Sequence, residues 1–291
     1  MKNIISTFAV FFFVCSAAAQ TYITHIYSSK DGVDLELDFY PAENPEATLI
    51  FVHGGGFYSG TRKEENIMHF CDSLAQAGIN AVNISYRLHL YGQSFHCDQP
   101  VKNKIRAIEV AAEDILSVTD YLLQNAEELH IDAEKIVLMG SSAGAEAALY
   151  AKYDLESSAF SALISCAGAS TDISKITKAS AIPTLMFHGT CDALVPYDKG
   201  IHHYCPPNSV GAMDLFGAYS IYQKMVDLDV SVELVTACGG KHGSAVTPLE
   251  KDIPLILEFI RRANSKGHFT IHEIRETGRT CTLPDGGVCN D

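Results

Sequence analysis

A serine enclosed by glycines is the first place where this sequence could carry out chemistry. Residues 140–144 read Gly-Ser-Ser-Ala-Gly, which places Ser142 at the centre of a G-x-S-x-G motif. An apolar run at 136–139 precedes the motif and a small-residue, helix-forming run follows it, so the serine would lie on a sharp strand-to-helix turn. The pattern predicts that Ser142 is a nucleophile; a buried serine in a tight turn is the alternative.

A second glycine-rich stretch precedes this motif along the chain. Residues 50–57 read IFVHGGGF, and three consecutive glycines at the end of a strand indicate a special backbone geometry. Such a stretch can cradle a phosphate or offer N–H groups to a developing oxyanion. The following Thr61-Arg62-Lys63 does not complete a phosphate-binding loop, so the oxyanion hole is favoured.

An acid and a base follow the serine along the chain. Asp192 comes after the strand-like run 184–188, and His242 lies in a glycine-rich loop after the run 231–235. A carboxylate can hold a histidine in the tautomer that accepts a proton from serine. The order Ser142, Asp192, His242 therefore predicts a catalytic triad.

The His-Gly-Gly-Gly stretch at 53–56, followed by the serine motif, resembles the α/β-hydrolase superfamily, in particular esterases similar to hormone-sensitive lipase and the carboxylesterases. The resemblance covers most of the chain, from about residue 22 to residue 262. It implies an oxyanion hole formed by the backbone N–H groups of Gly55, Gly56 and Ala143.

The same resemblance supports the choice of acid. Residues 188–196 are similar to the superfamily segment H-G-x-x-D-x-x-V-P, in which the aspartate is the triad acid. This implies Asp192. The competing carboxylates are Asp198 and Asp172. Asp172 also follows a strand, but one strand earlier in the chain than the usual position of the acid.

Strand-like runs alternate with helix-length segments through most of the chain, which indicates a parallel sheet covered on both faces. The first two runs alternate around Lys30-Asp31-Gly32 and predict an antiparallel hairpin. The connection 167–182 is too short to hold a cap. The expected fold class is α/β, an α/β-hydrolase fold with a mostly parallel eight-stranded sheet flanked by helices and no large cap domain. The expected strands are 21–27, 35–40, 48–53, 81–86, 135–139, 161–166, 184–188 and 231–235, and the expected helices are 64–77, 103–125, 142–152, 211–228 and 250–262.

The first residues predict export. Lys2 precedes an apolar run at 4–14, and small residues end the segment, as in a signal peptide cleaved near Ala19-Gln20. No later segment approaches the length of a membrane span, so no stable membrane anchor is expected and the protein should be secreted or periplasmic. The expected organisation is a signal peptide over 1–19, a catalytic domain over 20–265 and a C-terminal tail over 266–291.

The cysteine content fits an oxidising compartment. Of nine cysteines, Cys15 lies in the signal segment, and the remaining even number indicates disulfides. We expect Cys281 to pair with Cys289, because the turn-like LPDGG lies between them, and this bridge to pin the tail. A second expected pair, Cys191 with Cys205, would brace the loop between them.

Charge and composition exclude several classes of partner. A formal net charge of −14 disfavours nucleic acids and anionic membranes, which need clustered Lys and Arg. One cluster of histidines and cysteines fits no zinc spacing, so no metal is expected, and no organic cofactor is implied. The cluster consists of His188, Cys191, Asp192, His202, His203 and Cys205.

Two long loops, 87–102 and 197–210, are expected to shape an open site, since long loops in compact domains are often functional. Tyr91, Phe95 and His96 are candidate substrate-binding residues in the wall of that site. We expect a secreted serine carboxylic-ester hydrolase that acts on short acyl or aromatic esters of carbohydrates. The alternatives are a serine peptidase of the same fold and a ligand-binding relative without activity. The sequence leaves the oligomeric state open.

Overall fold

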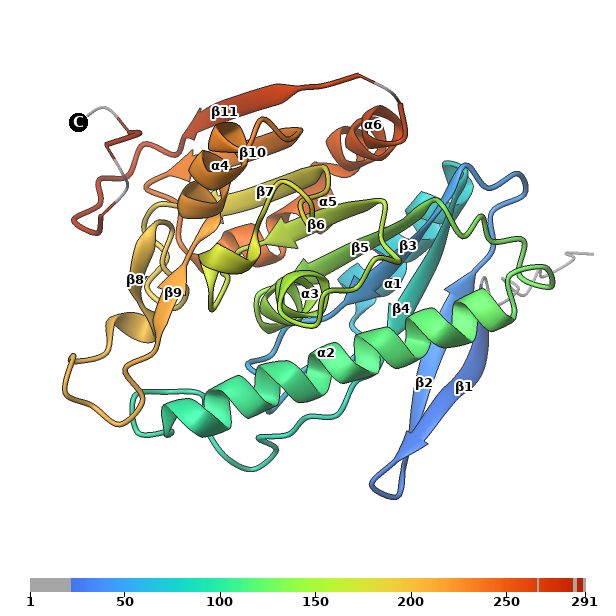
Figure 1. Cartoon of the computed structure of the whole chain (residues 1–291), viewed down its shortest axis with the longest axis horizontal. Coiled ribbons are helices and arrows are strands. Elements are labelled where there is room, and N and C mark those ends of the chain that lie inside the picture. The colour runs from blue at the N-terminus through green and yellow to red at the C-terminus, as the bar shows by residue number, and fades with distance from the viewer. Residues whose placement is uncertain (1–21, 266, 285–286, 290–291) are drawn as a thin grey trace, which may run out of the picture.

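The computed structural model describes residues 22–265, 267–284 and 287–289. The expected signal peptide and its cleavage position lie outside the described residues. One sheet dominates the described part, with nine strands in the order β1-β2-β4-β3-β5-β6-β7-β10-β11 (Figure 1). The strands are β1 (Ile23–Lys30), β2 (Val33–Tyr40), β3 (Ala47–Val52), β4 (Ile79–Ile84), β5 (Ile136–Ser141), β6 (Ala162–Cys166), β7 (Thr184–Gly189), β10 (Val232–Cys238) and β11 (Thr270–Glu276).

The direction of the strands confirms the expected mixed sheet. β1 and β2 form the antiparallel hairpin, and β2 pairs antiparallel with β4. From β4 through β3, β5, β6, β7 and β10 to β11 every pairing is parallel. The inner strands β3, β4 and β5 are buried along their whole length, because helices cover both faces of the sheet.

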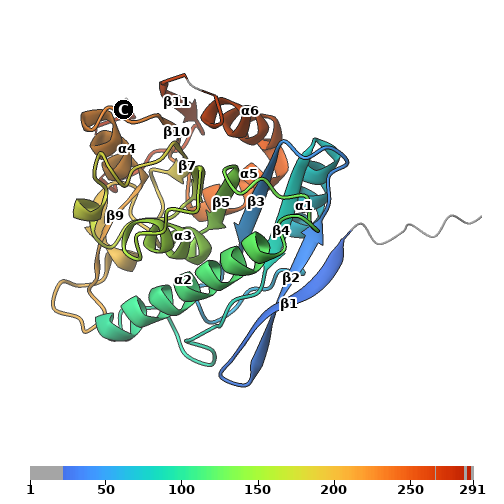
Figure 2. The same cartoon turned by 45° about the vertical axis from the view of Figure 1, so that its right-hand side comes forward.

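Helices form a layer on each face (Figures 1 and 2). The long helix α2 (Val101–Gln124) packs beside α3 (Ala143–Tyr153) on one face, together with α4 (Ala218–Asp227). The other face carries α1 (Glu65–Gln76), α5 (Thr247–Lys251) and α6 (Ile253–Ala263). The described helices contain no segment that is both long enough and apolar enough to span a membrane.

Two expected helices are wrong in extent. The helix expected over 211–228 begins only at Ala218, because β9 (Asp214–Phe216) precedes it and pairs with β8 (Lys199–Ile201). The helix expected over 250–262 is divided into α5 and α6. Pro254 lies at the start of α6, where its missing N–H group is tolerated.

The connection between β6 and β7 contains a single 3₁₀ turn, η1 (Ile173–Lys175), so no cap domain is inserted there. This leaves the carboxyl ends of the parallel strands open toward two loop regions, 85–100 and 190–213. Ligands of open α/β sheets bind at this edge.

The C-terminal tail is part of the sheet, which corrects the expected eight strands and the expected boundary after residue 265. β11 runs parallel to β10 over the whole length of the strand. A strand of mixed polar and β-branched residues is accepted at an edge position, where one side faces solvent.

The predicted disulfide pairs are wrong. Cys281 is bonded to Cys191, Cys289 to Cys238, and Cys205 to Cys97. The reason is that β11 carries the tail along β10, so each tail cysteine meets a loop or strand of the sheet rather than the other. The tail is therefore held to the sheet by two disulfides.

Candidate active site

The turn that carries Ser142 joins β5 directly to α3. Ser142 has φ 51° and ψ −120°, a strained conformation for a residue with a side chain. A Cβ atom on Gly140 would lie 2.2 Å from the carbonyl oxygen of Gly144, and one on Gly144 would lie 2.2 Å from that of Val52. Both glycines of the motif are therefore required by the close approach of backbone to backbone.

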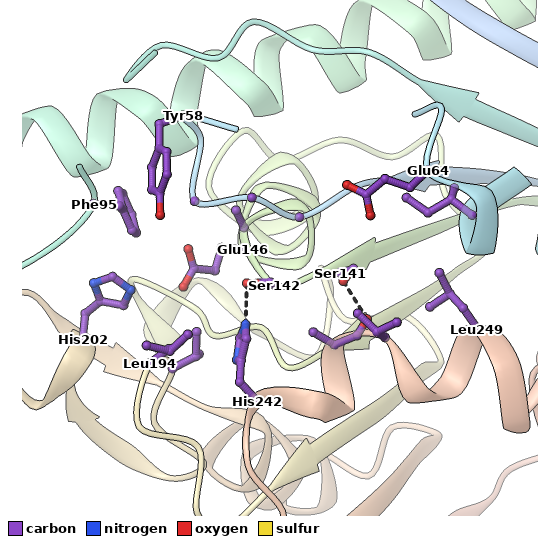
Figure 3. Close-up of a pocket in the computed structure, with 18 of the residues that line it drawn as sticks. Tyr58, Glu64, Phe95, Ser141, Ser142, Glu146, Leu194, His202, His242 and Leu249 are labelled. Atoms are coloured by element: carbon purple, nitrogen blue, oxygen red, sulfur yellow. Dashed lines mark hydrogen bonds between the residues drawn. The ribbon is translucent and has the colours of Figure 1, made fainter. Parts of the chain in front are cut away.

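The structure brings together the three residues expected to form a triad. Ser142 Oγ lies 2.8 Å from His242 Nε2 (Figure 3), and His242 Nδ1 lies 2.6 Å from Asp192 Oδ2. His242 begins the 3₁₀ turn η3 (His242–Ala245) after β10, and Asp192 follows β7. In this arrangement the imidazole can accept the serine proton while the carboxylate stabilises the resulting positive charge.

Asp192 is fully buried and heavily hydrogen-bonded. Its Oδ1 accepts from the backbone N–H groups of Leu194 and Val195, at 2.9 and 3.1 Å. Burial alone would raise the pKa of this carboxyl, but hydrogen bonds from His188 and His242 hold the pKa well below its usual range. Asp192 is therefore ionised whenever the site is near neutral pH.

The competing carboxylates serve other turns. Asp172 accepts hydrogen bonds from the N–H and hydroxyl groups of Ser174 at the start of η1. Asp198 accepts from the Ser220 hydroxyl at 2.5 Å.

Gly55 and Gly56 adopt left-handed backbone geometry, with φ of 111° and 61°. A Cβ on Gly55 would lie 2.1 Å from the carbonyl oxygen of Ser59, so no side chain fits. Gly55, Gly56 and Ala143 line the same cavity as Ser142. Their backbone N–H groups as oxyanion donors stay a prediction.

The glycine stretch is braced by aromatic rings. The His53 ring stacks on Tyr86 with centroids 4.5 Å apart, and its Nδ1 donates to the carbonyl oxygen of Gly54 at 2.7 Å. The Tyr86 hydroxyl donates to the carbonyl oxygen of His53 at 3.0 Å. Burial lowers the pKa of His53 to about 4, so the ring is neutral and serves as a rigid support.

Two of the three candidate wall residues reach the cavity. Phe95 is buried in its wall, with its ring 4.7 Å from that of His202, and His96 lines it with Nδ1 2.8 Å from His203 Nδ1. Tyr91 is the exception, because its side chain is 79% exposed and lines a different cavity near Arg87. The turn between 87 and 93 directs it outward, so its assignment to the substrate site is wrong.

Sequence reasoning missed three polar residues near the serine. Glu146 and His202 line the cavity, and Lys104 lies behind His202. Glu146 could have been found, because it lies in the first turn of α3, the helix whose N-cap is Ser142. Lys104 and His202 come from distant segments, and no local pattern relates them.

Two disulfides connect the tail to the segments that carry the acid and the base. Cys191 directly precedes Asp192 and is bonded to Cys281. Cys238 ends β10, shortly before His242, and is bonded to Cys289. The tail therefore restrains the two loops whose relative position sets the distance between Asp192 and His242.

We expect the double variant Cys191→Ala/Cys281→Ala to lose about 2–4 kcal/mol of unfolding free energy, because opening this long loop increases the entropy of the unfolded chain. Urea unfolding of oxidised protein measures the loss. Limited proteolysis should also cut the variant after β11. The control is Cys97→Ala/Cys205→Ala, which removes a disulfide but leaves the tail bonded. Equal protection of the tail in both variants would contradict this role.

Comparison with known proteins places the chain in context. Residues 37–172 match a family model described as BD-FAE. An ethyl acetate hydrolase from Pseudomonas putida is 28% identical over 123 residues, covering 40% of this chain and 34% of that protein. The non-reducing polyketide synthase ascC of Acremonium egyptiacum is 28% identical over 138 residues, covering 46% of this chain and 6% of that protein. The chain thus spans about a third or less of the length of these curated relatives.

Solved structures with the same architecture include esterase 2 of Thermogutta terrifontis. Its propionate-bound form is 21% identical with a TM-score of 0.62, covering 85% of this chain and 97% of that one. Its butyrate-bound form has a TM-score of 0.63 at 21% identity, covering 84% and 95%. This likeness shows the α/β-hydrolase fold.

Proposed function

We propose that this chain is a serine esterase of the α/β-hydrolase superfamily and that it hydrolyses short acyl or aromatic esters of carbohydrates outside the cytoplasm. The observation that carries the proposal is the continuous hydrogen-bonded chain from Ser142 through His242 to the buried Asp192. Ser142 and His242 line a cavity that is also lined by the glycine stretch at 54–56.

In the proposed mechanism Ser142 attacks the ester carbonyl while His242 takes its proton, and Asp192 holds the imidazole in place. The N–H groups of Gly55 and Ala143, with that of Gly56, would stabilise the oxyanion, each by about 2.7–4 kcal/mol. His242 then protonates the leaving alcohol, and water releases the acyl group from the serine. Each step uses groups of this chain and water.

The size of the cavity supports a small acyl group. Its volume is about 320 Å³, at the lower end of the range for ligand pockets. The ethyl acetate hydrolase and the propionate and butyrate in the solved esterase structures support the same size class. The match to BD-FAE over 37–172 supports acetyl and feruloyl esters.

Three disulfides support a location in an oxidising compartment. Together with the expected signal peptide over 1–19, they support a secreted or periplasmic enzyme. The short connection between β6 and β7, which holds no cap domain, supports an open site. An open site suits an ester on a bulky or polymeric partner.

A panel of esters tests this function on the purified protein. We expect turnover of p-nitrophenyl acetate and butyrate, with kcat/KM falling for longer chains as the acyl group outgrows the cavity. Acetylated and feruloylated oligosaccharides, compared with simple alkyl esters, measure the preference for carbohydrate. A strong preference for long acyl chains at a lipid interface would contradict the proposal. Turnover of peptide anilides at rates comparable with those of the esters would favour the serine peptidase. No turnover of any substrate would favour the ligand-binding relative without activity.

A further inference from the structure

A buried carboxyl oxygen without a hydrogen-bond partner lies in the wall of the catalytic cavity. Glu146 is 2% exposed, and its Oε1 accepts no hydrogen bond from any residue that the structure describes. Figure 3 shows the carboxyl group directed into the cavity, on the same side of Ser142 as Phe95 and His202. Burial of an unpaired polar oxygen is destabilising, so this group needs a role that the hydrolytic steps above do not supply.

The neighbouring histidine adds a donor to the same side of the cavity. His202 Nδ1 lies 3.3 Å from Lys104 Nζ, which also donates to the carbonyl oxygen of Gly211 at 2.8 Å. Because Lys104 is the donor in this contact, Nδ1 accepts and the proton of the ring is on Nε2. Burial keeps the pKa of His202 well below its ordinary value, so the ring is neutral. We call Glu146 and His202 the polar side of the cavity.

The opposite side of the cavity carries three aliphatic side chains, Ile67, Val246 and Leu249. Figure 3 shows Leu249 across the Ser142 and His242 pair from His202, with the exposed Glu64 on the same side as Leu249. Ser141, on this side, already donates its hydroxyl to the carbonyl oxygen of Ala245 at 2.6 Å. We call these three aliphatic residues the apolar side.

The protonation of Glu146 selects the kind of group it can bind. Burial raises the pKa of Glu146 to about 8; the Lys104 charge opposes this shift and the Asp192 charge adds to it. Near neutral pH the carboxyl group is therefore protonated, and it can both donate and accept a hydrogen bond. A hydroxyl group has the same two capacities, so the two groups are complementary.

We propose that Glu146 is a specificity-determining residue that binds a hydroxyl group on the alcohol half of the ester, while the acyl group lies against the apolar side. Glu146 lies one helical turn after the serine, because its backbone N–H donates to the carbonyl oxygen of Ser142 at 3.0 Å. Figure 3 shows its carboxyl group beside Ser142, where the alcohol half of a serine-bound ester could present a hydroxyl on the carbon next to the esterified one. Sugars and other polyols carry a hydroxyl at that position. The inference rests on the esterase function proposed above and names its substrate class.

A matched pair of substrates tests the proposal on the wild-type protein. 2-Hydroxyethyl acetate and propyl acetate differ only in a hydroxyl or a methyl group next to the esterified carbon. After correction for their rates of hydrolysis by hydroxide, we expect kcat/KM to favour the hydroxyl compound by about tenfold to a hundredfold. A second pair, ethyl hydroxyacetate and ethyl propanoate, carries the same change in the acyl half and should show no such preference.

Two variants assign the preference to this residue. Glu146→Met removes the polar atoms at similar length and should abolish the preference, whereas Glu146→Gln keeps a donor and an acceptor and should retain most of it. Because an unpaired buried carboxyl is removed, Glu146→Met should have an unchanged or higher melting temperature. The burst of p-nitrophenol from p-nitrophenyl acetate counts the competent sites, so each kcat is given per active serine.

Several outcomes would overturn the proposal. A wild-type enzyme that hydrolyses both acetates without preference refutes the role of Glu146 and leaves the esterase function intact. The same holds if the preference appears only in the acyl pair, or if Glu146→Met retains it. It also holds if Glu146→Met lowers kcat/KM for both acetates by the same factor and has a lower melting temperature than the wild type. An enzyme that hydrolyses none of these esters fails at the proposed function itself.

Discussion

Ser142→Ala should lower kcat for p-nitrophenyl acetate by a factor on the order of 10⁴ or more, and should abolish the burst of p-nitrophenol. The substitution removes the nucleophile and the proton that His242 accepts at 2.8 Å, yet leaves the glycine amides and the cavity in place. The residual rate would come from those groups acting on water. Stopped-flow absorbance at the nitrophenolate band measures both the burst and the steady state.

The matched control for this variant is Ser141→Ala. The two serines are adjacent, but Ser141 donates its hydroxyl to Ala245 in the turn that carries His242. Loss of that single hydrogen bond is expected to cost about 1 kcal/mol and to lower kcat less than tenfold. If Ser141→Ala lost the burst and Ser142→Ala kept it, the assignment of the nucleophile would be wrong.

Asp192→Asn should lower kcat by about 10⁴-fold with little change in KM. The amide nitrogen of asparagine would donate to His242 Nδ1, which now lies 2.6 Å from a carboxylate oxygen. The imidazole would then carry its proton on Nε2, facing Ser142, and could not act as the base. Steady-state kinetics at neutral pH with p-nitrophenyl butyrate measures the loss, and Asp172→Asn should stay within about twofold of wild type because its carboxyl caps η1.

Asp192 also predicts how stability depends on pH. A carboxyl whose pKa is lowered by folding contributes stability above its unfolded pKa, near 3.8, and this contribution is lost as pH falls toward the folded value. The wild-type melting temperature should therefore fall more steeply than that of Asp192→Asn between pH 5 and pH 2. Parallel slopes for the two proteins would show that Asp192 is not held ionised by its partners.

Much of the architecture could be predicted because its signals are local. The apolar run before Gly140, the tight turn and the small residues after it determine β5, the elbow and α3 within a few residues of chain. The hairpin of β1 and β2 follows from alternation around residues 30–32. The positions of Asp192 and His242 were predictable because each follows a strand, and parallel strands bring their carboxyl ends to one edge.

The features that sequence reasoning missed all depend on contacts between distant segments. The tail pairs as a ninth strand because β10 leaves an edge open, and this pairing decides which cysteines meet. Tyr91 and Phe95 look alike as loop aromatics, yet one faces solvent and the other is buried in the cavity wall. No periodicity specifies the path of such a loop.

By itself, then, the sequence determined the class of fold and the three residues that meet as serine, histidine and aspartate, since the motifs and the succession of strands and helices along the chain are properties of neighbouring residues. Only the tertiary structure decided the disulfide pairing, the place of the tail and the two unlike sides of the cavity. Glu146 shows why: its position on α3 is local, but its burial is set by the segments that close over it. A carboxyl group acquires its pKa and its unpaired oxygen from those surroundings.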